Sequence, residues 1–199
     1  MFDSLVQAFS GPGSAFMYAI TAVLAFGLAV GLERVFVLLV RLRTDEASVL
    51  SQAASGDLGG ARAAAGSHPV AQLIEAGAGA SGGDAAWDRM ASEAALIERD
   101  VRQRVPYLAT VGNISTMLGL LGTVYGLILA FTGLGDASAV ERAQKLSEGI
   151  ATAMSTTAFG LMVGIPALAL HAFLEGRANR ILRFCEAVAG RVAATRRAD

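Results

Sequence analysis

Three long windows without Asp, Glu, Lys or Arg constrain this chain more than any other feature of its sequence. They cover residues 4–32, 105–135 and 149–174. A helix needs about 20 apolar residues to cross roughly 30 Å of hydrocarbon, and each window is longer than that. The chain is 54% hydrophobic and only 17% charged, whereas soluble domains carry about 25% charged residues. We therefore predict an all-α membrane protein with three transmembrane helices.

Arginines flank these windows unevenly, and their placement predicts the topology. The positive-inside rule puts Arg-rich flanks in the cytoplasm, so the N-terminus and the connection between the second and third spans lie outside. The flanking arginines are Arg41 and Arg43, Arg102 and Arg104, and Arg177, Arg180 and Arg183. The predicted segments are 1–40 (N-terminus and first span), 41–104 (cytoplasmic), 105–135 (second span), 136–148 (outer connection), 149–174 (third span) and 175–199 (cytoplasmic C-terminal helix).

Both cytoplasmic segments favour helices. Residues 85–105 keep a helical period that runs directly into the second span, and Ile181, Cys185 and Val188 keep one after the third. We expect the second and third transmembrane helices to continue into the cytoplasm as long extensions.

Composition excludes several function classes. A formal net charge of −1 gives no basis for nucleic-acid binding. The single cysteine, Cys185, forms no intrachain disulfide and builds no thiolate zinc site. No nucleophile elbow, metal-ligand spacing or buried His/Asp/Glu cluster is recognisable, so we expect no enzyme, no metal and no cofactor.

Small and hydroxyl-bearing residues line one side of the second and third spans. At about 100° per residue, they fall within a narrow arc of each helix. In the second span these residues are Gly112, Thr116, Gly119, Thr123, Gly126 and Ala130, with Asn113 beside them. In the third span they are Thr152, Thr156, Gly160, Gly164 and Ala167, with Thr157 at the edge. Gly122–Gly126 and Gly160–Gly164 are also G-x-x-x-G pairs, which allow membrane helices to approach closely.

Two interpretations of these stripes remain open. In the first, they only pack, with each threonine bonded to its own helix. In the second, the hydroxyl oxygens line a water-containing path and contact a passing cation or proton carrier. Neither span has an Asp, Glu, Lys, Arg or His in its central portion. If the chain conducts protons, another protein has to supply the titratable group.

The two spans carry a family resemblance. "GLLGTVYGLILAF" at 119–131 and "STTAFGLMVGIPAL" at 155–168 resemble the paired signature of the ExbB/TolQ/MotA family of proton-channel subunits. Three spans, the Glu33–Arg34 pair and "HPVAQLIEAG" at 68–77 are similar to the ExbB/TolQ branch.

This resemblance implies a homopentamer whose second and third spans surround a central pore. It also implies two copies of an ExbD- or TolR-like single-span partner, each bringing an aspartate into the pore. Proton flow would then drive rotation in the bacterial inner membrane, with the N-terminus periplasmic. The energised process would lie in the envelope or at the outer membrane.

Residue by residue, Thr123 matches the threonine of the family's G-T-V and Thr157 that of its T-A-x-G-L, both pore-facing. The branch commonly has a glutamate where this chain has Thr152. Glu148, one turn earlier, is either a substitute at the periplasmic mouth or a solvated interfacial acid. The Thr156–Thr157 pair resembles sodium-driven stators, so sodium stays open beside protons. A passive oligomeric scaffold is the other alternative.

Overall fold

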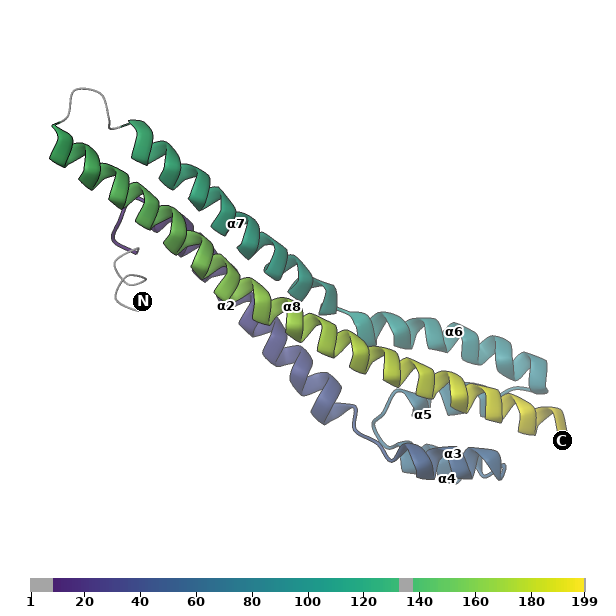
Figure 1. The fold of residues 1–199 in the computed structure, drawn as a ribbon. Coiled ribbons are helices and arrows are strands. Elements are labelled where there is room, and N and C mark those ends of the chain that lie inside the picture. The colour runs from purple at the N-terminus through teal and green to yellow at the C-terminus, as the bar shows by residue number, and fades with distance from the viewer. Residues whose placement is uncertain (1–8, 133–137, 199) are drawn as a thin grey trace. The chain divides into compact units, whose positions relative to one another are not determined.

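The computed structural model describes residues 9–132 and 138–198, which form helices and no strands (Figure 1). In chain order they are α2 Ser14–Val35, the π-helical turn η1 Phe36–Arg41, α3 Glu46–Ala54, α4 Leu58–Ala65, α5 Val70–Ala78, α6 Gly83–Arg102, α7 Val105–Thr132 and α8 Ala139–Ala198. Three stretches are long and apolar enough to cross a membrane: Ser14–Arg41, Gly83–Thr132 and Ala139–Arg197. The prediction of an all-α chain with three candidate spans is confirmed. Residues 1–8, 133–137 and 199 lie outside the described residues. They belong to the predicted N-terminus, to the predicted junction of the second span with the outer connection, and to the end of the predicted C-terminal helix.

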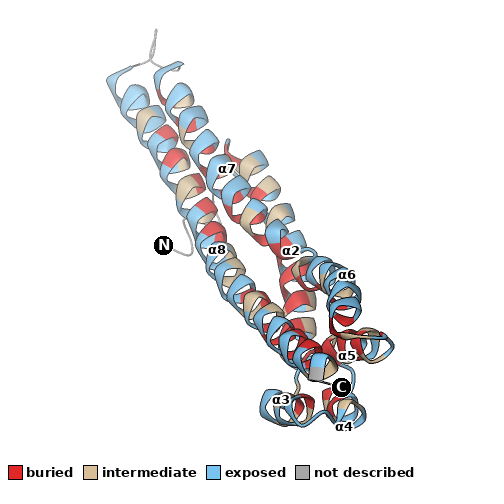
Figure 2. Cartoon of the chain, turned by 90° about the vertical axis from the view of Figure 1, so that its right-hand side faces the viewer, coloured by how far each residue is buried: buried red, intermediate tan, exposed pale blue. Residues whose placement is uncertain are grey.

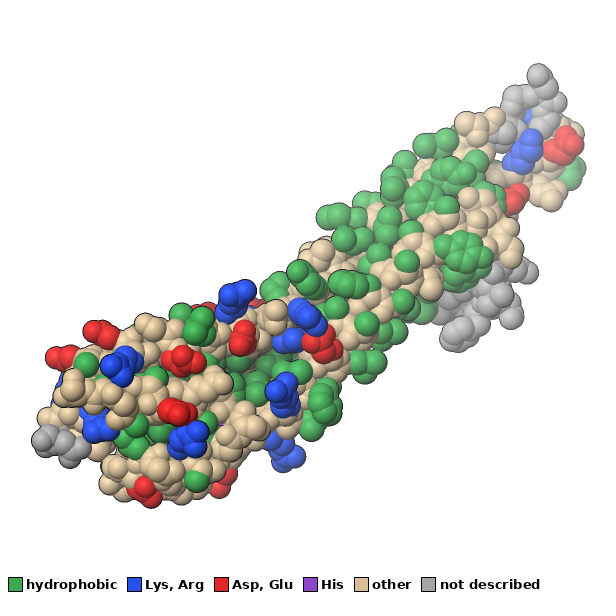
Figure 3. All heavy atoms as spheres, turned by 180° about the vertical axis from the view of Figure 1, so that it is seen from behind, with side chains coloured by type: hydrophobic (Ala, Val, Ile, Leu, Met, Phe, Trp, Pro, Cys, Tyr) green, Lys and Arg blue, Asp and Glu red, His purple; other side chains and the backbone are tan. Residues whose placement is uncertain are grey.

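The chain divides into two compact units. Unit 1 comprises Met1–Gly31 and Pro106–His171, and unit 2 comprises Leu32–Val105 and Ala172–Asp199. In unit 1, α2 packs against both other helices, because Gly27 lies against Val111 of α7 and Gly31 lies against Leu170 of α8. On the face seen in Figure 3, hydrophobic side chains cover the middle of unit 1, and charged side chains gather over unit 2. This face of unit 1 is therefore apolar, as contact with lipid requires.

In unit 2, α3, α5 and α6 contact the C-terminal part of α8, and α4 packs against α3 and α5. The buried α8 residues alternate in steps of four and three, which keeps them on one side of the helix. Figure 2 shows this buried side of α8 in red. These residues are Leu174, Ala178, Ile181, Cys185, Val188 and Val192, and the other helices of unit 2 bury Val49, Leu73, Ile74, Met90 and Ile97.

Polar side chains of α8 also cap the short helices of unit 2. The last carbonyls of a helix have no partner within it. Arg191 donates to the Leu50 carbonyl of α3 at 3.1 Å, and Thr195 donates to that of Ala53 at 3.4 Å. Arg196 donates to the Ala78 carbonyl, the last of α5. Several of the cationic groups on this part of α8 are therefore engaged within the unit.

His68 is buried at the start of α5, with 3% of its surface exposed. Its Nδ1 accepts a hydrogen bond from the Val70 N–H at 3.2 Å, and its ring meets Phe184 edge-on at 5.5 Å. Burial and, to a smaller extent, the charge of Arg177 lower the pKa of His68 to about 4. The imidazole is therefore neutral at physiological pH and acts as a capping acceptor for α5.

The expected continuous helix from residue 85 into the second span is interrupted. α6 ends at Arg102 and α7 begins at Val105. Arg104, between them, has φ +64°, a left-handed conformation that costs a non-glycine residue about 1 kcal/mol or more. The spacing of apolar residues in the sequence cannot reveal this interruption, because the same helical spacing continues from α6 into α7.

Candidate functional site

α7 and α8 approach so closely that only glycine fits at several positions between them. A Cβ added at Gly119 would lie 3.2 Å from the Gly160 Cα, and one added at Gly126 would lie 2.6 Å from the Ala153 backbone nitrogen. Both distances are to backbone, which cannot move without separating the helices. The structure places all the glycines expected to pack the spans at this interface: Gly119, Gly122, Gly126, Gly160 and Gly164.

The close approach brings Thr123 of α7 and Thr157 of α8 together. Their two hydroxyl oxygens are hydrogen-bonded to each other. Thr157 also lies 3.1 Å from the Gly119 carbonyl, and Thr123 lies 3.3 Å from the carbonyls of Gly119 and Ala153. We call this arrangement of two hydroxyls and two carbonyls the threonine cluster. Both threonines are partly exposed in the single chain, so other molecules can reach the cluster.

Thr152 and Thr156 lie on a different edge of α8. Thr156 is fully buried, and its hydroxyl donates to its own helix, at 3.0 Å from the Ala153 carbonyl and 3.1 Å from that of Thr152. A Cβ on Gly13, just before α2, would lie 2.7 Å from the Thr152 methyl and 3.3 Å from the Thr156 methyl. Thr152 therefore faces the start of α2, whereas Thr156 lies between the start of α2 and α7, where a Cβ on Gly122 would lie 2.6 Å from the Thr156 Cβ. Thr157 faces α7 at Thr123.

The remaining residues expected along the pathway are exposed. Thr116 lies on the same side of α7 as Thr123, and its hydroxyl donates to the Gly112 carbonyl at 3.0 Å. Asn113 lies further around α7 and is also exposed. Glu148, one turn before Thr152, is exposed as well. From the expected set, the structure brings Thr123 and Thr157 together across two helices, with Thr116 next along the same edge of α7, and it brings Thr152 and Thr156 together within α8.

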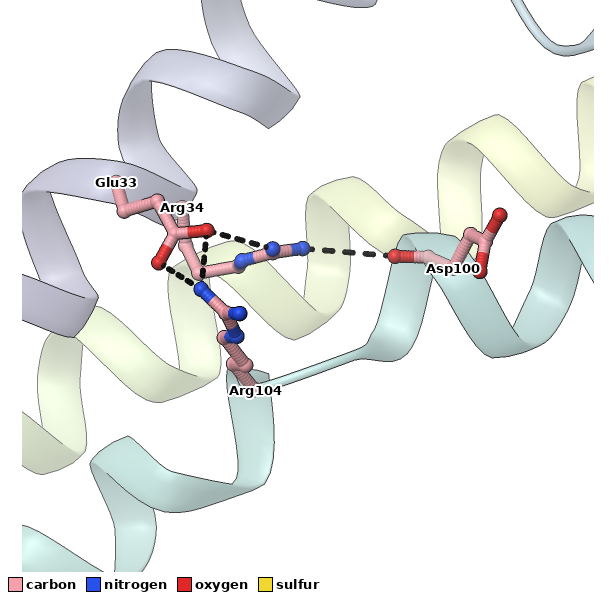
Figure 4. A network of polar contacts seen from close by, with 4 residues as sticks. All are labelled: Glu33, Arg34, Asp100 and Arg104. Carbon is pink, nitrogen blue, oxygen red and sulfur yellow. Dashed lines mark hydrogen bonds and ion pairs between the residues drawn. The ribbon is translucent and has the colours of Figure 1, made fainter.

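Two polar features of the chain were not among the residues that the sequence predicted for the site. The Ser115 hydroxyl in α7 is fully buried and has no hydrogen-bond partner among the described residues. In unit 2, Glu33 accepts from Arg34 at 3.0 Å and from Arg104 at 2.7 Å, and Arg34 reaches the Asp100 carbonyl (Figure 4). The adjacent Glu33–Arg34 letters are the only sequence signal for this network, because Arg104 is distant in sequence.

The threonine cluster can exchange hydrogen bonds but cannot hold a charge of its own. Hydroxyl groups donate and accept hydrogen bonds without titrating near neutral pH. α7 contains no Asp, Glu, Lys, Arg or His, and α8 has none from Gly149 to Leu170. Within the described part of the chain, no group of three or more His, Cys, Asp or Glu residues could bind a metal ion. The cluster therefore suits contact with an acid or a hydrated ion supplied from outside the chain.

Comparisons with known proteins agree with this picture. The profile of the MotA/TolQ/ExbB proton channel family matches residues 67–187, which include α5, α6, α7 and the cluster threonines. The Tol-Pal system protein TolQ of Haemophilus influenzae is 42% identical over 81 residues, covering 41% of this chain and 35% of that protein. The biopolymer transport protein ExbB of Aquifex aeolicus is 35% identical over 96 residues, covering 48% of this chain and 64% of that protein. Each alignment thus spans less than two thirds of the relative.

A solved structure shows that the fold is shared. The match to the structure of C. jejuni MotAB covers 92% of this chain and 77% of the MotAB chain, with a TM-score of 0.51 and 15% sequence identity. At that identity the similarity concerns the fold alone. The family profile covers more than half of the sequence and includes both helices that build the threonine cluster. This chain therefore belongs to the MotA/TolQ/ExbB proton channel family.

Proposed function

We propose that this chain is the ion-conducting stator subunit of an inner-membrane motor of the ExbB/TolQ type. Five copies surround a pore that holds two copies of an ExbD/TolR-like single-span protein. Protons pass between the aspartate of that partner and the threonine cluster, and their flow drives rotation. The N-terminus is periplasmic and the C-terminus cytoplasmic. The rotation energises an envelope process or transport across the outer membrane.

The observation that carries this proposal is the threonine cluster itself. Thr123 and Thr157 are hydrogen-bonded across two helices, at a partly exposed edge of an interface rich in glycine. Threonines also occur where membrane helices only pack, but the partial exposure of these two hydroxyls lets a partner reach them. A protonated carboxylic acid, by contrast, needs hydroxyl and carbonyl oxygens to accept its O–H group. The absence of titratable residues from the central parts of both helices supports an acid that comes from a partner.

The placement of the adjacent threonines Thr156 and Thr157 favours protons over sodium as the conducted ion. A sodium path that uses both would present two neighbouring oxygens to the ion in place of its hydration shell. The Thr156 hydroxyl instead donates to carbonyls of its own helix and is fully buried. Only Thr157 of the pair bonds to Thr123, and the Thr156 hydroxyl meets the cluster only at the Ala153 carbonyl of its own helix. We therefore expect ion flow to persist when sodium is replaced by potassium.

A passive scaffold is the second candidate, and it also has a supporting observation. Thr116 and Thr156 bond back to carbonyls of their own helices, as threonines do when they only pack. The two candidates differ in what they require of the cluster hydroxyls. A scaffold tolerates the loss of these hydroxyls if the shape is kept, and a conducting path does not.

The test is proton flow through the complex purified with its native partner and reconstituted in vesicles. Valine keeps the shape of threonine and removes its hydroxyl, so we would compare T123V, T157V and the double variant with the original chain. We expect each single variant to assemble normally and to reduce proton flow about tenfold or more, since a hydrogen bond to a charged group contributes about 1.5–3 kcal/mol. A pH-sensitive dye inside the vesicles reports the flow.

T110V is the matched control, because it makes the same change on an exposed side of α7, where the Thr110 hydroxyl donates to the Pro106 carbonyl of its own helix. We expect it to retain both assembly and proton flow. Normal flow in T123V, T157V and the double variant would overturn the conducting role of the cluster. An equal loss in T110V and T157V would also contradict it, since the effect would then not depend on the cluster.

A further inference from the structure

Unit 2 contains a partly open polar cavity of about 390 Å³ where the first candidate span ends. Its polar lining includes five residues with N–H or O–H donors, namely Arg34 of α2, Arg41 of η1, Ser67, Gln72 of α5 and Gln103. Both arginines are cationic, and the acids Glu33 of α2 and Asp100 of α6 also line the cavity. The cavity belongs to neither the threonine cluster nor the interface between α7 and α8, so the function proposed above leaves it without a role.

Arg34 is the unusual residue of this cavity. It is 5% exposed, yet the structure satisfies only part of its hydrogen-bonding capacity. One terminal nitrogen donates to Glu33 at 3.0 Å, the other makes a long 3.5 Å contact with the Asp100 carbonyl, and Nε has no partner among the described residues (Figure 4). Buried donors without acceptors are unfavourable by about 1–3 kcal/mol each. An additional acceptor would therefore be stabilised here.

The charges around the cavity leave an excess of positive charge. Glu33 is shared between two guanidinium groups, those of Arg34 and Arg104. Asp100 offers Arg34 its backbone carbonyl, and in Figure 4 its carboxylate points away from that arginine. Arg41 is exposed and has no ion pair within the described part of the chain. Two arginines and two carboxylates line the cavity, and Arg104, outside the lining, pairs with Glu33. The three arginines and two carboxylates of this group together carry one net positive charge, which favours an anion.

We propose that this cavity binds the phosphate group of an anionic phospholipid. A guanidinium group matches phosphate oxygens with paired N–H donors. The candidate span Ser14–Arg41 ends at the cavity, which places the arginines at the depth of lipid headgroups. Basic pockets at the ends of membrane helices are typical binding sites for anionic headgroups. This site is independent of ion conduction, so it can stand or fall without the proposed function.

The test adds short-chain phosphatidylglycerol to the delipidated complex in an uncharged detergent. Native mass spectrometry counts the lipids retained, and the midpoint of thermal unfolding follows binding, because a ligand that binds only the folded state raises it. Short-chain phosphatidylcholine and inorganic phosphate are the comparison ligands. R41Q removes one cation from the cavity, and R43Q removes the same charge from an exposed position outside the cavity lining.

We expect the original chain and R43Q to retain phosphatidylglycerol, and R41Q to bind it about tenfold more weakly. Phosphatidylcholine should bind much less, because it has no net negative charge. Equal losses in R41Q and R43Q would overturn the proposal, since they would indicate general attraction to positive charge. Equal binding of both lipids would overturn it too. If inorganic phosphate alone raised the unfolding midpoint as much as phosphatidylglycerol does, the result would contradict a lipid as the occupant.

Discussion

At the scale of single residues, neighbouring threonines have different environments. Thr156 and Thr157 are adjacent in sequence, yet Thr156 is fully buried between Gly13 and Gly122, and Thr157 meets Thr123 at a partly exposed edge. Helical periodicity predicts which residues share a face, and it placed Thr157 at the edge of the stripe. It cannot tell which of the two edges of the stripe packs against the first span. That information comes only from contacts such as the one between Gly13 and Thr152.

His68 provides a prediction about pH at the same scale. Its folded pKa is about 4, against about 6.5 in an unfolded chain, so the unfolded state takes up a proton first as pH falls. Its contribution to stability is therefore fully present above about pH 6.5 and is lost progressively towards pH 4, by up to about 3 kcal/mol. We expect the thermal unfolding midpoint of the original chain to fall over this range.

H68N is the matched variant, because its amide oxygen can accept the Val70 N–H bond without titrating. The midpoint of H68N should fall less between pH 6.5 and 4 than that of the original chain. Measurement by circular dichroism in detergent compares the two profiles, and other titrating groups cancel in the difference. Parallel profiles would show that burial of His68 does not set the pH response.

At the scale of elements, contact between α7 and α8 depends on glycines that touch backbone. In G126A the added methyl would lie 2.6 Å from the Ala153 nitrogen and 2.7 Å from the Gly149 carbonyl oxygen. The helices would have to separate, and overpacking of this kind lowers the free energy of unfolding by about 1–3 kcal/mol. We expect a lower thermal midpoint and weaker ion flow, because separation also parts Thr123 from Thr157.

G190A is the matched control in α8. A Cβ at Gly190 has no atom within 4 Å in the described part of the chain, and alanine favours helix by about 0.5–1 kcal/mol. G190A should therefore be as stable as the original chain or more stable. If G126A and G190A had the same midpoint, the close approach of the two helices would not be what the glycines provide.

Much at the element scale could be predicted, and the exceptions have physical reasons. Charge-free windows give the candidate spans because lipid excludes unpaired charges. The interruption at Arg104 was missed, since its left-handed backbone leaves no trace in hydrophobicity. The network at Glu33 was missed because its second arginine is supplied by a residue far along the chain. Burial of His68 was missed because its neighbour Phe184 lies on α8.

At the scale of the whole molecule, the proposed proton path needs a titratable group from a partner. The sequence of α7 and residues 149–170 of α8 have hydroxyls and glycines but no Asp, Glu, Lys, Arg or His. A proton crossing a potential of 100 mV releases about 2.3 kcal/mol, so the passage of several protons can drive a conformational step. In the proposed function, this chain supplies the hydroxyls and a partner supplies the acid. The proposed function therefore depends on assembly.

The most direct test of that division is the mass of the complex purified from its native membrane. Native mass spectrometry gives the copy number of this chain and identifies what is bound with it. We predict five copies together with two copies of a small single-span protein that has an aspartate in or beside its span. A closed oligomer that contains no such protein, in a preparation that still conducts protons, would contradict the account.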